Sequence, residues 1–242
     1  MKAILQLLFV IGSASAALAQ TQIVVPGGLA DTEGNSSSSG PFATGSARFQ
    51  QIYSASEFAS LGAPNGLITG MSFRLDNSVD QRHLGSWDIS IALLTTSQSP
   101  DGLNPTFSVN TGPDATLVLS RRIGWLATPS SGSETQPFLI RIPFTTPFLY
   151  SPQQGNLEVD MFMVGTGSFL LDAHLEFNDG VGRVFADSAL ATTGTVDSLG
   201  LITSFDIVPI PEPSGILLAL ISVSLFILTG HIWPKTNQVT KS

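Results

Sequence analysis

The chain has 242 residues, contains no cysteine and carries a formal net charge of −8. The lack of cysteine excludes a disulfide framework, thiolate zinc sites and a cysteine nucleophile. The acidic balance argues against nucleic acid as a partner, because binding to phosphates needs basic side chains. Glycine and proline, at 23 and 15 residues, are too frequent for a helical bundle and are typical of a β protein rich in turns.

Residues 1–19 have the pattern of a secretory signal peptide. Lys2 supplies a positive charge, Ile4–Ile11 form a short apolar stretch, and Ala17–Ala19 form an A-x-A cleavage site. The apolar stretch is too short to span a bilayer. We therefore expect export, with cleavage before Gln20.

Residues 20–45 are expected to form a flexible N-terminal segment. Their central part, residues 26–41, consists largely of Gly, Ser and Pro and offers few apolar side chains to bury. A segment of this composition gains too little from burial to offset the entropy that it loses on ordering.

Residues 46–208 have the pattern of an all-β domain. Apolar and polar residues alternate over residues 87–94, which places Trp87 and Ile89 on one face of a strand and Asp88 on the other. Turn residues separate the segments, and no segment keeps the 3.6-residue period of a helix. Roughly eight to eleven short strands predict an antiparallel β-sandwich or jelly roll. The expected strands fall near residues 47–53, 67–75, 87–94, 115–121, 138–144, 156–164, 168–177, 183–186 and 201–208.

The part of the chain that we expect to be exported is strongly acidic. Residues 20–210 contain seven arginines, no lysine and 17 acidic residues, which gives a net charge of −10. This charge favours solubility, and it opposes adhesion to anionic surfaces unless cations bridge the two.

Residues 209–213 form a proline-rich linker, and residues 214–233 are expected to form a single transmembrane helix. Ser214–Gly230 contains no charged residue, and about 20 residues at about 1.5 Å each suffice to cross a hydrocarbon core. Lysines follow the apolar run, so the positive-inside rule places the short tail of residues 234–242 in the cytoplasm. The N-terminal bulk of the protein would then lie outside.

The C-terminal region resembles the PEP-CTERM sorting signal. Pro211-Glu212-Pro213 stands directly before the apolar run, and basic residues follow that run. The resemblance implies an exported bacterial protein whose tripeptide is recognised by a sorting protease of the exosortase type. It also implies an association with extracellular polysaccharide. The tail departs from the family pattern, since Lys235 and Lys241 stand where the family has a compact arginine cluster.

The β region carries a second resemblance, to an uncharacterised secreted β domain that is often joined to PEP-CTERM tails. The residues concerned are 32–35, 41–42, 48–53, 58, 87–89, 106–107 and 155–157. This resemblance implies a β fold and assigns no activity.

The sequence contains no nucleophile elbow, zinc-protease helix, phosphate loop or dinucleotide fingerprint. Two acid pairs are nevertheless candidates for a glycosidase or lyase on a jelly roll. One pair is Glu158 with Asp160, and the other is Asp172 with Glu176, which flank His174. Alternation along a half-buried strand explains the same spacing by placing these residues on a solvated outer face. We therefore expect a non-enzymatic protein with no catalytic residues.

Calcium is the one cofactor that the sequence suggests, as part of an alternative function. Oxygen-rich loops at residues 76–80 and 178–180 supply Asp76, Asp80 and Asp179 as candidate metal ligands. Neither loop matches an EF-hand.

Trp125 is the candidate residue for a carbohydrate site. It lies near Arg121 and Arg122, and an aromatic ring can stack on a sugar or on a guanidinium group. Packing in the core or at its rim is the alternative role for this ring. The main expectation is an exported surface or extracellular-matrix protein held at the membrane, with a carbohydrate- or calcium-binding module as the alternative.

Overall fold

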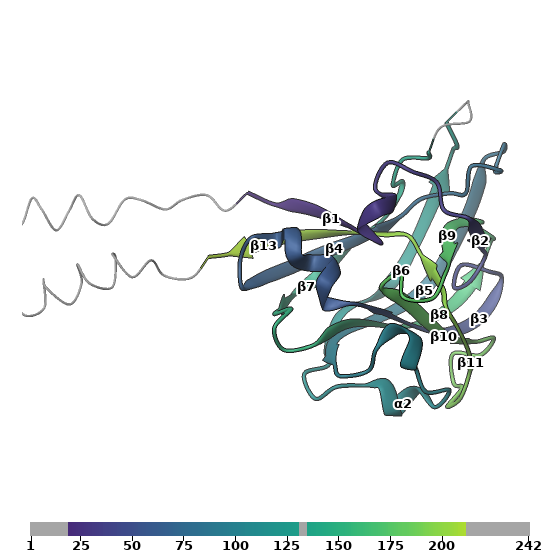
Figure 1. Ribbon diagram of the computed structural model, residues 1–242. Helices are drawn as coiled ribbons and strands as arrows, with labels where there is room; N and C mark the ends of the chain where they lie inside the picture. The colour runs from purple at the N-terminus through teal and green to yellow at the C-terminus, as the bar shows by residue number, and fades with distance from the viewer. Residues whose placement is uncertain (1–18, 131–134, 212–242) are drawn as a thin grey trace, which may run out of the picture. The chain divides into compact units, whose positions relative to one another are not determined.

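The computed structural model describes residues 19–130 and 135–211 (Figure 1). These residues form 13 strands, and all strand pairings among them are antiparallel. The described part of the chain is therefore all-β, as the alternation of apolar and polar residues predicts. The strands are β1 (Thr21–Val25), β2 (Ser36–Ser38), β3 (Gly45–Tyr53), β4 (Asn65–Phe73), β5 (His83–Thr96), β6 (Thr116–Ala127), β7 (Ile140–Tyr150), β8 (Asn156–Thr166), β9 (Leu171–Leu175), β10 (Val181–Ala186), β11 (Thr195–Asp197), β12 (Leu199–Leu201) and β13 (Thr203–Ile210). The short helical turns are η1 (Gly27–Leu29), η2 (Ala55–Leu61), η3 (Pro100–Gly102) and α2 (Phe107–Asn110).

The strands are arranged in three sheets. The first has the order β1-β13-β4-β7, the second β11-β10-β3-β8-β5-β6, and the third β12-β9-β2. The third sheet adjoins the first, because Leu75, just after β4, forms a bridge with Leu171 of β9. The backbone N–H of Asp172 also donates to the carbonyl oxygen of Arg74 at 3.1 Å, which ties β9 to the same end of β4.

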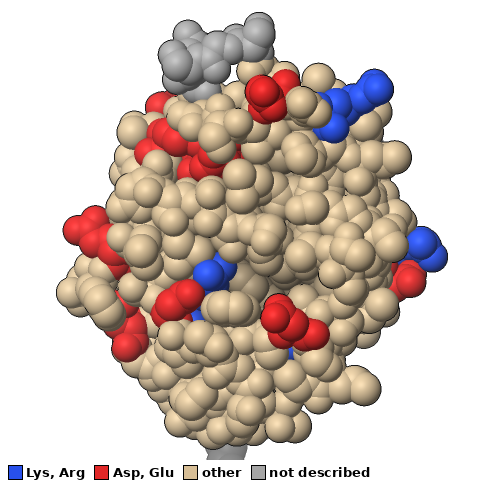
Figure 2. All heavy atoms as spheres, turned by 90° about the vertical axis from the view of Figure 1, so that its right-hand side faces the viewer, with Lys and Arg blue, Asp and Glu red and all other residues tan. Residues whose placement is uncertain are grey.

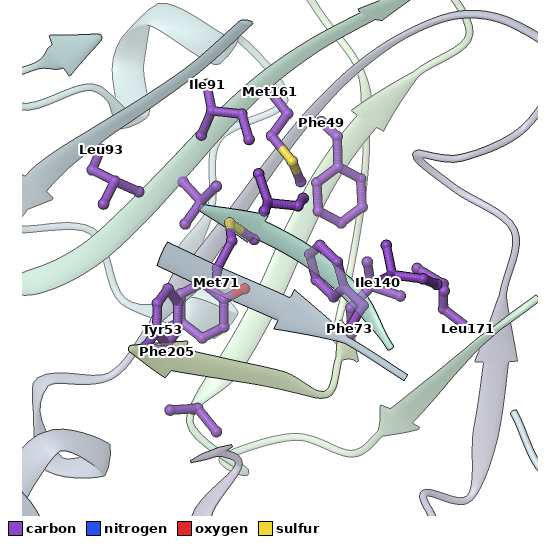
Figure 3. Close-up of a cluster of buried hydrophobic side chains, with 14 of the residues drawn as sticks. Phe49, Tyr53, Met71, Phe73, Ile91, Leu93, Ile140, Met161, Leu171 and Phe205 are labelled. Carbon is purple, nitrogen blue, oxygen red and sulfur yellow. The ribbon is translucent and has the colours of Figure 1, made fainter. Parts of the chain in front are cut away.

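The core lies between the inner faces of the sheets. Phe49 of β3 and Ile91 of β5 come from the six-stranded sheet, and Met71 of β4 and Phe205 of β13 come from the four-stranded sheet. Figure 3 shows these side chains meeting in one cluster, with Leu171 of β9 beside them. Full burial of an apolar side chain of this size stabilises a fold by about 1.5–3 kcal/mol. The shared core makes the arrangement sandwich-like.

The register of β5 follows the sequence prediction. Trp87, Ile89 and Ile91 are at most 2% exposed, whereas Asp88 between them is exposed. Because successive side chains of a strand point to opposite faces, this register decides which residues enter the core. The turn predicted at residues 178–180 also forms, between β9 and β10.

A covering segment, residues 97–114, lies over the outer face of the six-stranded sheet. It contains the turns η3 and α2. Phe107 of α2 packs with Ile52 of β3 and Val184 of β10 in a second, smaller core. This part of the outer face is therefore closed to solvent, a feature that the alternation of residues along the strands does not predict.

The expectation of a flexible segment over residues 20–45 is wrong. This segment contains β1, which pairs with β13, and β2, which pairs with β9. Val25 and Phe42 are fully buried in the main core. The composition is misleading because a few apolar anchors, together with Arg74 from a distant part of the chain, hold a polar loop in place.

The predicted linker at residues 209–213 begins later than expected. Pro209 and Ile210 belong to β13 and pair with Gly66 and Asn65 of β4. Pro211 follows the strand and is exposed.

The number of strands also exceeds the prediction, because the three-residue strands β2, β11 and β12 are too short to give a clear alternation.

The proposed targeting segments fall largely outside the described residues. These are the signal peptide (apart from Ala19), Glu212 and Pro213 of the sorting motif, the transmembrane helix at 214–233 and the tail at 234–242. Within residues 19–130 and 135–211, no helix is both long and apolar enough to span a membrane.

Candidate functional site

Three carboxylates from separate parts of the chain meet where β9 adjoins the end of β4. They belong to Glu33, in the loop before β2, to Asp76, just after β4, and to Asp172 of β9. One oxygen of each lies within 4.8 Å of the chosen oxygens of the other two. We call these three residues the acidic cluster.

The loop after β4 fixes the position of Asp76. The backbone N–H of Asp76 donates to the carbonyl oxygen of Leu170 at 3.0 Å, and its Oδ1 accepts from the N–H of Ser78 at 2.9 Å. A side-chain oxygen that accepts from the backbone two residues later is the usual turn geometry of aspartate. The next N–H along the loop, that of Asn77, donates to Oε1 of Glu33 at 2.7 Å. One short turn thus holds two of the three carboxylates.

The loop that carries Glu33 lies directly against β9. The N–H of Gly34 donates to Oδ1 of Asp172 at 3.0 Å. A Cβ atom at position 34 would lie 2.0 Å from the carbonyl oxygen of Ala173, so no residue larger than glycine fits without moving the backbone. Gly34 therefore allows the close approach that brings Glu33 to Asp172.

Arg74 is the cation next to the acidic cluster. Its Nε donates to Oδ2 of Asp172 at 2.6 Å. Its Nη1 donates to the carbonyl oxygen of Ala30, and its Nη2 donates to those of Leu29 and Thr32. The guanidinium group has five N–H donors in a fixed plane, so one side chain can hold both the loop and the carboxylate.

The charges of the acidic cluster are not balanced. When all three carboxylates are ionised, one guanidinium group leaves a net charge of −2. Oε2 of Glu33 is buried and has no hydrogen-bond partner among the described residues. Burial raises the pKa of Glu33, and the charges of Asp172 and Asp76 raise it further. A proton on Glu33 or a bound cation would each relieve this imbalance.

Carboxylate oxygens are the ligands that Ca²⁺ prefers, and they also suit Mg²⁺. The acidic cluster offers one carboxylate oxygen each from Glu33, Asp76 and Asp172. Backbone carbonyls and water supply the remaining ligands at many calcium sites, so three carboxylates are enough side-chain ligands for such a site. The chemistry of the donor set therefore fits a hard divalent cation.

Of the three candidate calcium ligands predicted from sequence, one lies in the acidic cluster. Asp76 is there, whereas Asp80 is exposed and lies outside it. The carboxylate of Asp179 accepts from the N–H of Val181 and lies 2.9 Å from Nδ1 of His174. Sequence reasoning did not identify Glu33 as a ligand, because its segment appeared flexible.

Trp125 packs against the rim of the core. Its ring meets that of Phe42 edge to face at 5.5 Å and lies 6.0 Å from that of Trp87. Its Nε1 donates to the carbonyl oxygen of Arg141 at 3.0 Å. Both the apolar surface and the polar group of this half-buried side chain are thus used within the protein, which matches the alternative role expected for it.

The solvated outer face expected for Glu158 and Asp160 is not observed. Glu158 is fully buried and Asp160 is 5% exposed, because the covering segment lies over this part of β8. Asp160 pairs with Arg48 at 2.9 Å and accepts from Nε2 of Gln50 at 3.0 Å. Both oxygens of Glu158 lack a hydrogen-bond partner within the described parts of the chain. Burial, with the nearby charge of Asp160, raises the pKa of Glu158 to about 8.

The second acid pair is also divided between different contacts. Asp172 is bound to Arg74 in the interior, whereas Glu176 is exposed and lies 3.7 Å from Nε2 of His174.

No protein-family model matches the chain, and a search of curated proteins finds no relative. The function of the site must therefore follow from the contacts described above.

Proposed function

We propose that the protein is an exported surface or extracellular-matrix protein whose C-terminal region is a sorting signal and membrane anchor. The observation that carries this proposal is the Pro211-Glu212-Pro213 tripeptide directly before an uncharged run of Ser214–Gly230. The signal-peptide pattern of residues 1–19 supports export of the region between them. A sorting protease of the exosortase type is the partner that this arrangement implies.

The position of Pro211, the first residue of the tripeptide, supports access by such a protease. Strand β13 ends at Ile210, and Pro211 is exposed one residue later. Pro211 thus lies just beyond the sheet, so a protease need not unpair a strand to reach this residue. We also propose that the β domain is an antiparallel sandwich or jelly roll and that a single transmembrane helix follows it at residues 214–233.

The contacts of the acidic residues support a non-catalytic role for the β domain. Asp160 is engaged by Arg48 and Gln50, and Asp172 is engaged by Arg74. These carboxylates, which the sequence suggested for glycoside hydrolysis, hold strands and loops together. In this role the folded, acidic β domain would be a structural component of the extracellular layer.

Cell fractionation tests the sorting proposal. The full chain and a variant in which Pro211-Glu212-Pro213 is deleted are expressed in a host that encodes an exosortase. Deletion is expected to keep the protein in the membrane fraction, whereas the wild-type protein is processed and leaves it. Pro209→Ala, which alters a neighbouring proline outside the tripeptide, serves as the control and should behave as the wild type. Identical distribution of the wild type and the deletion variant would refute the proposal.

A second candidate function is calcium binding by the β domain. The specific observation that favours it is the acidic cluster of Glu33, Asp76 and Asp172, with one buried oxygen of Glu33 left without a hydrogen-bond partner in the described chain. Extracellular concentrations of Ca²⁺ are high enough for weak sites to be filled. A rise in unfolding temperature on addition of millimolar Ca²⁺ is the expected result.

A further inference from the structure

A cavity of about 460 Å³ lies where the chain passes from β2 into β3. Its wall is formed by residues 38–41 and 43–49 on one side and, on the other, by Arg183 and residues 185–187 at the end of β10. This volume falls in the range of about 300–1,000 Å³ that is typical of small-molecule sites. Neither the acidic cluster nor the sorting segment contributes to the wall.

Arg183 is the most buried charged group in this wall. It is 7% exposed, its Nε and Nη2 donate to the carboxylate of Asp197 at 2.8 and 3.0 Å, and its Nη1 donates to Oγ of Ser38 at 2.8 Å. The guanidinium group also lies 4.6 Å from the ring centroid of Phe185, which is half-buried. These contacts fix the side chain and leave two of its five N–H groups for another acceptor.

The charges around the cavity favour a neutral ligand. Asp197 neutralises Arg183, and Asp160 neutralises Arg48, the other arginine of the wall. An anion would meet the carboxylate of Asp187, which has no paired cation in the wall, and the overall acidic charge of the domain, which appears in Figure 2 as more red than blue on the face with β2, β9 and β11. A cation would meet two guanidinium groups instead.

The polar groups of the cavity favour a ligand with many hydroxyl groups. Ser39 and Asp187 are exposed at its wall, and neither side chain makes a hydrogen bond within residues 19–130 and 135–211. The wall therefore offers a carboxylate acceptor, a hydroxyl group that can both donate and accept, and the remaining donors of Arg183. Phe185 adds an aromatic surface suited to the C–H groups of a sugar ring.

We propose that this cavity binds a neutral saccharide of one or two sugar rings. The proposal goes beyond sorting and anchoring, because neither needs a ligand in the β domain. It also differs from the sequence-based expectation for carbohydrate binding, since Trp125 has no part in it. Binding depends on the cavity between β2, β3 and β10, with Asp187 and Arg183 as the polar contacts and Phe185 as the apolar one.

An array of neutral and uronic-acid-containing glycans tests this proposal. The full chain is used, in a detergent without a sugar headgroup, and the matched variants are Ser39→Trp, which fills the cavity, and Thr128→Trp, at an exposed position outside it. Asp187→Asn is compared with Asp80→Asn in the same way. Unfolding temperatures of all variants are measured first, so that a misfolded variant is recognised.

The wild type and Thr128→Trp are expected to bind at least one neutral glycan. Ser39→Trp should reduce that affinity at least tenfold, which corresponds to about 1.4 kcal/mol. Asp187→Asn should weaken binding, whereas Asp80→Asn should not. The proposal is overturned by an absence of binding to every neutral glycan, by binding only to acidic glycans, or by binding that Ser39→Trp leaves intact. These outcomes do not bear on the sorting proposal, which fractionation tests separately.

Discussion

Nε of Arg74 donates to Oδ2 of Asp172 at 2.6 Å, and neither side chain is more than 1% exposed. This buried ion pair joins the end of β4 to β9. The same guanidinium group donates hydrogen bonds to three carbonyl oxygens of the loop that carries Glu33. One side chain therefore orders a polar segment and positions two members of the acidic cluster.

Arg74→Ala should destabilise the protein strongly. The substitution leaves the carboxylate of Asp172 buried without its counterion, and loss of one partner of a buried pair typically costs about 3–5 kcal/mol. Urea unfolding at neutral pH measures the effect. Arg82→Ala, at an exposed position, is the control and should change the free energy of unfolding by less than about 0.5 kcal/mol. Equal unfolding midpoints for the two variants would contradict this role of Arg74.

Glu33→Gln should abolish the response of the protein to Ca²⁺. Millimolar Ca²⁺ is expected to raise the unfolding temperature of the wild type, because a cation that binds only the folded state stabilises it. Asp76→Asn should have the same effect as Glu33→Gln, since both side chains belong to the acidic cluster. Asp80→Asn, in the same loop but outside the cluster, should retain the response. A wild type that does not respond to Ca²⁺, with a flat calorimetric titration, excludes the metal site.

The sheet fold was predictable from sequence because its long strands alternate regularly. β5 is the best example, since its four inward residues Trp87, Ile89, Ile91 and Leu93 are all buried. The segment of β1 and β2 was not predictable. Its order depends on Arg74, which lies more than 40 residues away in the chain, and on a glycine contact with β9. Local composition carries no information about such partners.

The candidate site was only partly predictable for the same reason. Asp76 was identified because it lies in an oxygen-rich loop, whereas Asp172 was noted only as one of a strand pair. Their proximity depends on the bridge between Leu75 and Leu171, a tertiary contact. Glu158 was misjudged because strand alternation predicts two faces but cannot show that the covering segment shields one of them.

Trp125→Ala should reduce stability and leave saccharide binding unchanged. The ring packs against Phe42 and Phe169, and its removal takes away aromatic contacts at the rim of the core. Complete truncation of a buried aromatic residue costs about 3–5 kcal/mol, and the half-buried ring should cost somewhat less. Chemical unfolding and the glycan array measure the two properties. Trp125→Phe should recover part of the stability. Loss of glycan binding in a variant that remains folded would show that Trp125 contributes to the carbohydrate site.

Glu158→Gln should remove much of the pH dependence of stability. Burial raises the pKa of Glu158 to about 8 in the folded protein, from 4.5 for an ordinary glutamate. Between these values the unfolded chain has lost this proton and the folded chain retains it, so the free energy of unfolding falls as pH rises and levels off above about pH 8. Each pKa unit corresponds to about 1.4 kcal/mol, so the total change is on the order of several kcal/mol.

Urea unfolding at about pH 5 and about pH 8 tests this prediction. Glutamine resembles the protonated carboxyl group in shape and carries no charge at either pH, so Glu158→Gln should lose less stability than the wild type over this interval. Asp80→Asn, which alters an exposed carboxylate, should keep the wild-type dependence. The amide hydrogens of residues 97–114 should also lose protection, measured against their intrinsic exchange rates at each pH, in the wild type at the higher pH, because the ionised side chain of Glu158 lies beneath this segment. A Glu158→Gln protein with the same pH dependence as the wild type would show that Glu158 is already ionised in the fold.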